Sequence, residues 1–241
     1  MTDKPLVAIT GASSGIGEAS ARAFSAAGYP VLLMARRLER MEAMSLPDSV
    51  CRRVDVRDRD QIGSAIAEAE AIHGPVDCLI NNAGLASLGD IAHLDPAQGD
   101  ETVDINCKGV TNGIYSVMHK MMERERGTII NMSSIAGRKI YPHHTIYNGA
   151  KHFVHAVTES WREYLAPYGV RVMVIAPGFV ESEILESVTD EGVLTAYDEA
   201  RQAIGGPLDA SYVADAMLYA YGLPQEVILQ EICITPTKQG Y

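Results

Sequence analysis

The chain has 241 residues, enough for one large domain or two small ones with a substantial hydrophobic core. Hydrophobic residues make up 47% and charged residues 21%, a globular composition that argues against disorder. The formal net charge of −11 argues against a nucleic-acid-binding protein, because such a protein needs a basic stripe. At first sight the same charge also argues against an anionic ligand.

The four cysteines lie far apart and form no C-x-x-C pair, so we expect neither a metal site nor a disulfide framework. The N-terminal residues show no apolar signal core. No apolar run approaches the roughly 20 residues needed to span a bilayer. We therefore predict a cytoplasmic protein with no membrane partner.

Apolar strand patterns alternate with helical patterns along the chain. Strands are expected at residues 5–10, 31–35, 50–56, 76–81, 128–133, 170–176 and 227–234. Helices are expected from the first glycine turn to Gly28, from residue 36, and at 58–73, 101–123, 145–166 and 211–221. Because the strands lack polar alternation and are separated by helices, they predict one doubly wound α/β domain, a parallel sheet of about seven strands. Residues 181–207 are expected to form a partly helical flap over the sheet edge.

A glycine-rich turn follows the first expected strand, with the sequence TGASSGIG at residues 10–17. Between a strand and a helix, such glycines allow the backbone to approach a pyrophosphate at the positive helix N-terminus. The spacing G-x-x-x-G-x-G is one residue longer than the ordinary dinucleotide fingerprint. This variant resembles the short-chain dehydrogenase/reductase family.

Further motifs extend the resemblance over nearly the whole chain. They are NNAG at 81–84, Asn106 with Gly109, Ser134, the YxxxK of Tyr147 and Lys151, and Pro177-Gly178. The serine stands 13 residues before the tyrosine, which is the family spacing. The resemblance, strongest to bacterial NADPH-dependent aldehyde, ketone and 3-hydroxy-acid reductases, implies a Rossmann-type domain. It also implies a homotetramer or homodimer, with pairing through the helices at 101–123 and 145–166.

The chemistry expected of these residues is carbonyl reduction, in which the oxygen gains negative charge and must receive a proton. Tyr147 is the expected acid. Lys151 at i+4 shares its helix face, so its ammonium is expected to lower the pKa of the phenol. Ser134 is placed to hydrogen-bond the substrate oxygen. The resemblance implies that Lys151 also holds the nicotinamide ribose and that Asn106 supports a water that relays protons to solvent.

The end of the second strand predicts which dinucleotide is bound. In an NAD site an acidic residue about 20 positions beyond the glycines binds the ribose 2′-hydroxyl. Here the strand ends in Ala35-Arg36-Arg37, and an arginine can bind a 2′-phosphate bidentately. We therefore predict NADP(H), with Arg36 as the first choice for the phosphate and Arg37 as the second. The resemblance adds the remaining cofactor contacts: Gly11, Ser13, Ser14, Gly15, Ile16, Gly17, Asp55, Val56, Asn82, Ala83, Gly84, Tyr147, Lys151, Pro177, Gly178, Val180 and Ser182.

The substrate should lie beyond the carboxyl ends of the strands. The expected walls are mostly apolar: Leu85, Ser134, Ile135, Ala136, His144, Tyr147, Phe179, Ile184 and Leu185. No arginine stands out as a carboxylate clamp, although Arg138 could reach the mouth. This composition favours an uncharged aldehyde or ketone and an NADPH-dependent carbonyl reductase.

Three alternatives stay open. A 3-hydroxy-acid (serine-like) dehydrogenase and a β-ketoacyl reductase share the same motifs. Outside enzymes, the alternative is a non-catalytic NADPH-binding sensor. A pure binder need not keep Asn106, Ser134, Tyr147 and Lys151 together, which argues against the sensor. The sequence names neither the substrate nor the direction of the reaction.

Overall fold

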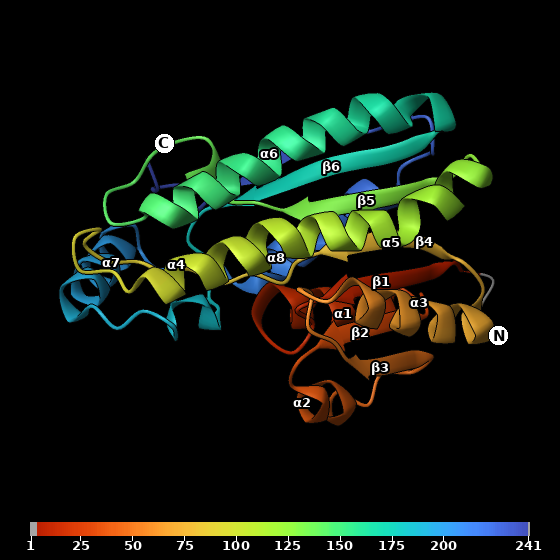
Figure 1. Ribbon diagram of the computed structural model, residues 1–241, viewed down its shortest axis with the longest axis horizontal. Coiled ribbons are helices and arrows are strands. Elements are labelled where there is room, and N and C mark those ends of the chain that lie inside the picture. Colours follow the sequence, from red (N-terminus) through yellow and green to blue (C-terminus); the bar gives the residue numbers. More distant parts are fainter. Residues whose placement is uncertain (1–3, 241) are drawn as a thin grey trace.

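The strand order defines the architecture of the computed structural model, which describes residues 4–240. Seven parallel strands form one sheet in the order β3-β2-β1-β4-β5-β6-β7 (Figure 1). The order reverses between β1 and β4, which is the switch point where doubly wound sheets bind ligands. The predicted fold is confirmed. The strands are β1 Leu6–Thr10, β2 Val31–Ala35, β3 Ser49–Arg53, β4 Val76–Asn81, β5 Gly127–Met132, β6 Val170–Pro177 and β7 Glu231–Ile234.

Helices cover both faces of the sheet. Apolar residues of α3, α5 and α6 pack on one face, and those of α1, α2 and α8 pack on the other (Figure 1). Because both faces are covered, the central strands are buried throughout, which is why they read as unbroken apolar runs. The helices are α1 Gly15–Ala26, α2 Leu38–Ala43, α3 Arg59–His73, α4 Pro96–Val103, α5 Gly109–Glu123, α6 Thr145–Leu165, α7 Glu191–Ala203 and α8 Ala210–Gly222.

The long helix predicted at 101–123 begins five residues earlier, at Pro96. Asp95 caps it by accepting a hydrogen bond from the Ala97 amide at 2.9 Å, and proline suits the first helical turn. A π-helical segment, Asp104–Lys108, joins α4 to α5. This wider turn contains Asn106 and is a common feature of functional sites.

The last strand is shorter than predicted and begins at Glu231 instead of residue 227. Arg171 on β6 provides the physical reason. Its guanidinium donates to the carbonyl oxygens of Tyr221 at 2.9 Å, Leu223 at 3.1 Å and Val227 at 3.2 Å. The Val227 carbonyl is therefore bound to a side chain instead of a neighbouring strand.

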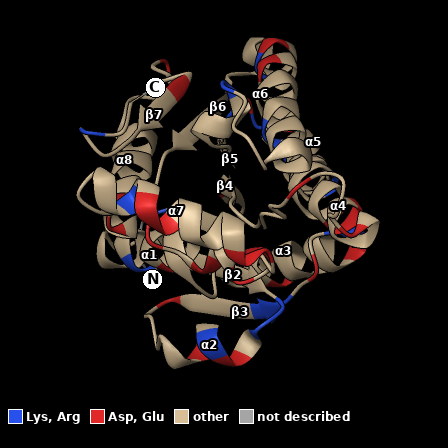
Figure 2. Cartoon of the chain, turned by 90° about the vertical axis from the view of Figure 1, so that its left-hand side faces the viewer, with Lys and Arg blue, Asp and Glu red and all other residues tan. Residues whose placement is uncertain are grey.

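The predicted flap is partly helical. It contains a 3₁₀ turn, Glu183–Leu185, and the helix α7. Figure 2 looks onto the carboxyl ends of the strands and shows α7 in front of them. The flap therefore lies over the sheet edge at which the site was expected.

The cysteines Cys51, Cys78, Cys107 and Cys233 are free thiols. Among residues 4–240, no helix combines the length and the apolar character needed to cross a membrane.

Candidate active site

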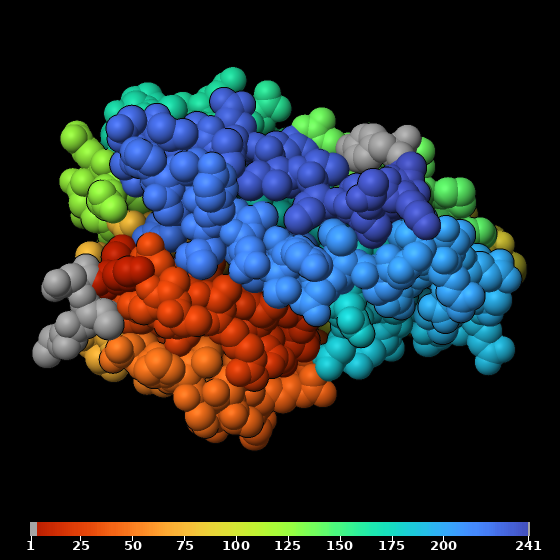
Figure 3. Space-filling view, turned by 180° about the vertical axis from the view of Figure 1, so that it is seen from behind, coloured from red at the N-terminus to blue at the C-terminus, as the bar shows by residue number. Residues whose placement is uncertain are grey.

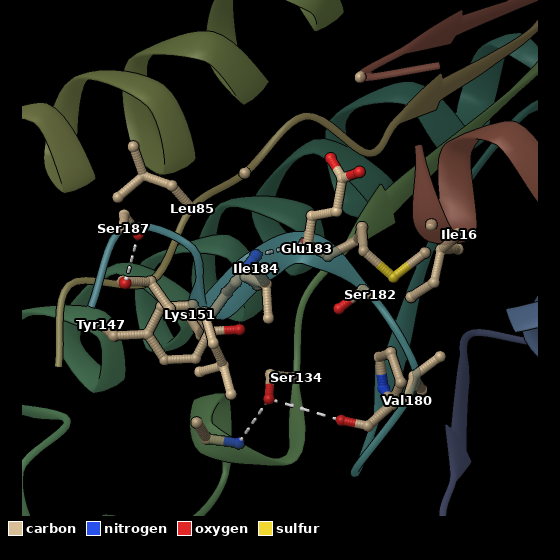
Figure 4. A pocket seen from close by; sticks show the side chains of 18 of the residues that line it. Ile16, Leu85, Ser134, Tyr147, Lys151, Val180, Ser182, Glu183, Ile184 and Ser187 are labelled. Atoms are coloured by element: carbon tan, nitrogen blue, oxygen red, sulfur yellow. Dashed lines mark hydrogen bonds between the residues drawn. The ribbon is translucent and has the colours of Figure 1, made fainter. Parts of the chain in front are cut away.

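A cavity of about 590 Å³ lies between the glycine turn, the carboxyl ends of the strands and the flap. Its volume is in the range of cofactor and ligand sites. Nearly all the predicted cofactor and substrate residues line it. Gly17 and Asn106 do not, because each packs behind a neighbour that does. Figure 4 shows Ser134, Tyr147 and Lys151 together with Leu85 and the flap residues around them.

The glycine turn is fixed against the turn that follows β4. Gly11 has φ +65°, and a Cβ there would lie 2.7 Å from the Ala83 Cα. A Cβ on Gly17 would lie 2.2 Å from the Gly11 carbonyl oxygen. The Thr10 hydroxyl accepts hydrogen bonds from the amides of Asn82 at 3.0 Å and Ala83 at 3.1 Å. The backbone can thus approach a ligand closely, as the motif predicts.

The N-terminus of α1 points its amides at this cavity. Ser14 stands at the N-cap position but makes no side-chain capping hydrogen bond. The first N–H groups of a helix have no intrahelical partner and favour anions. This end of the cavity therefore fits a phosphate group.

The two arginines after β2 have different surroundings. Arg37 donates to the hydroxyls of Ser14 at 2.8 Å and Ser13 at 3.3 Å, so its guanidinium is tied to the glycine turn. Arg36 has a side chain 63% exposed and makes an ion pair with Glu101 at 3.6 Å. Its donors remain available to a phosphate, and the choice between the two arginines stays a prediction.

Glu183 connects the flap to the cofactor end of the cavity. Its carboxylate contacts Arg40 at 2.6 Å and Arg37 at 2.7 Å. The hydrogen bond from Arg40 is the largest cause that lowers the pKa of Glu183 to about 2. The sequence does not predict this role of Glu183, because nothing in it indicates that the flap reaches α2.

Asp55, predicted to contact the adenine, lies beside Arg57. The Arg57 Nε donates to both carboxylate oxygens, at 2.9 and 3.0 Å, and this contact holds the pKa of Asp55 below its usual value. Its carboxylate therefore stays ionised and fixed in direction at the cavity wall.

Asn106 is fully buried and holds the segment after NNAG. Its Nδ2 donates to the Leu85 carbonyl at 2.7 Å, and its Oδ1 accepts from the Leu85 amide at 3.2 Å. The structure thus shows a positioning contact for Asn106, and its predicted role in a proton relay stays a prediction.

Tyr147 and Lys151 lie one turn apart on α6, both buried. The Lys151 Nζ donates to the Met132 carbonyl at 3.1 Å and lies 5.5 Å from the centre of the Tyr147 ring. Burial raises the pKa of Tyr147 well above its usual value and lowers the pKa of Lys151 to about 8. Burial is the largest cause of the raised pKa of Tyr147, and the expected effect of the Lys151 ammonium on that pKa stays a prediction.

Ser134 presents its hydroxyl to the same cavity. The Oγ accepts a hydrogen bond from the Ala136 amide at 3.1 Å and donates to the Pro177 carbonyl at 3.4 Å (Figure 4). The second hydrogen bond is long, so the hydroxyl can turn to a substrate oxygen at little cost.

Aromatic rings form the substrate end of the cavity. Phe179 packs edge-on against Tyr197 of α7, with ring centres 4.7 Å apart, and His144 stacks on Tyr197 at 6.3 Å. Burial lowers the pKa of His144 and raises that of Tyr197 to about 12, so both rings are neutral at pH 7. Tyr197 was missed by sequence analysis, because its position gives no signal beyond a helical pattern.

Few charges line this end. The lysines and arginines of the cavity wall are Arg36, Arg37 and Lys151, and the two arginines stand at the glycine turn. Arg138 does not line the cavity, and its guanidinium pairs with Glu231 instead. The expectation that Arg138 reaches the mouth is wrong. Among residues 4–240, no group of three or more His, Cys, Asp or Glu side chains is arranged to hold a metal ion.

Comparison with known proteins identifies the family. Residues 5–192 match the short chain dehydrogenase family. The chain is 36% identical over 249 residues to a sulfoacetaldehyde reductase of Chromohalobacter salexigens, covering 100% of this chain and 96% of that protein. The serine dehydrogenase structure in its closed form with NADP⁺ superposes with a TM-score of 0.89 at 30% identity, covering 98% of this chain and 96% of that one. The chain therefore belongs to the short-chain dehydrogenase/reductase family and is an oxidoreductase.

The chain also matches one segment of a much longer protein, the glycine betaine reductase of Emericella nidulans. The identity is 35% over 237 residues, covering 96% of this chain. The match spans 18% of that protein's length.

Loss of the ion pairs that Glu183 makes with Arg37 and Arg40 should loosen the flap. In Glu183→Gln, we expect trypsin to cleave the native protein at Arg201 about two to five times faster, the effect of losing a surface ion pair. Because the pKa of Glu183 is lowered, the bridge is present above pH 4.5 and is lost as the pH falls toward 2. In the wild type, hydrogen exchange of the α7 amides, corrected for the intrinsic pH dependence of exchange, should therefore accelerate only in that acidic range, where trypsin no longer acts. The control is Glu186→Gln in the same flap, and equal cleavage rates in both variants would contradict the prediction.

Proposed function

We propose that the protein uses NADPH to reduce an uncharged aldehyde or ketone to an alcohol, with Tyr147 as general acid/base. One observation carries the proposal. Tyr147, Ser134 and Lys151 meet at one end of a cavity whose other end has the glycine turn and Arg36. A dinucleotide bound along that cavity would have its phosphates near the arginines and its nicotinamide near Tyr147.

The bound dinucleotide supplies the hydride, and the protein handles the proton. Tyr147 keeps its proton at neutral pH because burial raises its pKa, so it is ready to donate to the substrate oxygen. The Ser134 hydroxyl donates a second hydrogen bond to that oxygen and stabilises its developing charge. Lys151, with a pKa of about 8, holds a proton that can replace the one given up by Tyr147.

The residues fit NADP(H). The uncapped amides of α1 suit the pyrophosphate, and Arg36 suits the 2′-phosphate. Asn82 and Ala83 would flank the adenosine ribose, and Val180 and Ser182 would hold the carboxamide. Two similar structures support the assignment: the serine dehydrogenase bound to NADP⁺ and, at 28% identity, an actinorhodin polyketide ketoreductase bound to NADPH.

The absence of an arginine from the described walls around Tyr147, where Lys151 is the basic side chain, supports an uncharged substrate. A sulfonate or carboxylate group near Tyr147 would meet His144, Phe179 and Tyr197 and no arginine. Burying an unpaired anion there is costly. The names of the similar proteins nevertheless keep a 3-hydroxy-acid dehydrogenase as the second candidate. A β-ketoacyl reductase and a non-catalytic sensor are less favoured functions. The cytoplasmic location of the protein stays a prediction.

The test of the proposal is NADPH oxidation on a panel of carbonyl compounds. We expect turnover of uncharged aldehydes and ketones at a kcat/KM at least about tenfold above that for sulfoacetaldehyde, with little oxidation of serine by NADP⁺. Tight NADPH binding with no turnover of any class would favour the sensor. A preference for the charged compounds would overturn the substrate assignment.

Tyr147→Phe removes the proposed acid and little else. We expect kcat to fall about 10²- to 10⁴-fold, while Tyr164→Phe on the same helix leaves it unchanged. For the wild type, kcat/KM for reduction should decline above about pH 8, because Lys151 then loses its charge. Equal activity of the two variants would rule out the mechanism.

Arg36→Ala tests the cofactor assignment. We expect the Kd for NADPH to rise about 10- to 100-fold and the Kd for NADH less than about threefold, because only NADPH carries the 2′-phosphate. Arg53→Ala is the matched control, since its side chain is also 63% exposed. Tighter binding of NADH than of NADPH by the wild type would refute the assignment.

We also propose self-association as a homodimer or homotetramer. Helices α5 and α6 expose large aromatic side chains, among them Tyr115 at 44% and Tyr164 at 57%. Exposed apolar surface of this kind marks interaction sites. Sedimentation velocity should show a dimer or tetramer at micromolar concentration, and a lone monomer would contradict the proposal.

A further inference from the structure

The C-terminal tail, residues 235–240, folds back onto the turn that follows β6. The Gln239 Oε1 accepts a hydrogen bond from the Phe179 amide at 2.9 Å, and Gln239 lines the cavity. The backbone amide of Gln239 donates to the Pro236 carbonyl at 2.9 Å, so residues 236–239 form a turn. Figure 3 shows the C-terminal segment, in dark blue, beside the lighter blue flap. The tail thus supplies a wall residue that no motif predicted.

Gly178 lies in close contact with this tail. A Cβ on Gly178 would lie 2.1 Å from the Gln239 Oε1 and 3.0 Å from the Thr235 Cγ2. The Gly178 amide also donates to the Ile234 carbonyl at 2.8 Å. A side chain at position 178 would therefore displace the Gln239 side chain, so the glycine leaves room for this contact between the tail and the turn.

The tail and Leu208, the residue directly after the flap, both hold the Phe179 backbone. Its amide donates to Gln239, and its carbonyl accepts from the Leu208 amide at 2.9 Å. Val180, the next residue, forms a parallel bridge with Leu208. Without Gln239, the Phe179 amide would lose its partner at the cavity wall.

We propose that Gln239 is a positioning residue that sets the place of Phe179 and Val180 in the site. The inference rests on the proposed function, in which Val180 holds the nicotinamide carboxamide and Phe179 forms the substrate wall. Because this hydrogen bond contributes to the position of both residues, displacing Gln239 should weaken cofactor binding and substrate binding together. Gln239 acts through the backbone and does not touch the reacting atoms.

Two substitutions separate the acceptor atom from the rest of the side chain. Gln239→Met keeps the length but removes the amide oxygen, whereas Gln239→Glu keeps an acceptor oxygen. Lys238→Met is the control, since Lys238 is the exposed neighbour. We measure the Kd for NADPH by fluorescence and hydrogen exchange at the Phe179 amide in the protein without cofactor. In Gln239→Met we expect a Kd about tenfold higher, faster exchange, and a raised KM for the carbonyl with kcat changed less.

Gln239→Glu should stay within about threefold of the wild type on each measure. If Gln239→Glu is as impaired as Gln239→Met, the acceptor is not the cause and the proposal fails. It also fails if Gln239→Met lowers the Tm but leaves the Kd and the exchange unchanged, since that pattern indicates only a stabilising tail. Absence of turnover in the wild type would reject the proposed function, whereas the Kd and the exchange would still decide the role of Gln239.

Discussion

The buried ammonium of Lys151 joins helix α6 to the end of strand β5 through its hydrogen bond to Met132. A buried charge is costly unless it is hydrogen-bonded, so this contact also determines where α6 can lie on the sheet. Tyr147 stands one turn before Lys151, and Ser134 stands two residues after Met132. This contact, with the hydrogen bond from the Ser133 hydroxyl to the Lys151 carbonyl at 3.0 Å, therefore links the positions of all three side chains. The same burial brings the pKa of Lys151 to about 8 and makes it able to exchange a proton.

The parallel sheet provides the second constraint, because it brings the carboxyl ends of its strands to one edge. Thr10 ties the turn after β1 to the turn after β4, and the flap and tail close the edge after β6.

The net charge of the chain is a poor guide to the charge of the ligand site. The chain carries −11, yet Arg36 and Arg37 stand together where the phosphates would lie. Ligand charge is matched by a few local side chains and by the amides of α1.

The sequence predicted the sheet and most of the site, because apolar runs and family spacing report on local structure and on positions fixed by it. It did not predict the π-helical turn at Asn106, since one extra residue barely alters a helical pattern. The short β7 depends on Arg171, which reads as an ordinary strand residue. The pKa of Tyr147 follows burial, which the Y-x-x-x-K spacing does not contain. Glu183, Tyr197 and Gln239 reach the site only through tertiary contacts far along the chain.

The return of the tail to the cavity wall has a practical consequence for making the protein. Strand β1 starts at the opposite end of the molecule from the tail, as the N and C labels of Figure 1 show. An affinity tag fused after the last residue would begin within a few residues of Gln239 and crowd the opening beside Phe179. A tag before β1 would stand far from every residue of the cavity. Kinetic work and crystallisation should therefore use an N-terminal tag or a C-terminus freed by a protease.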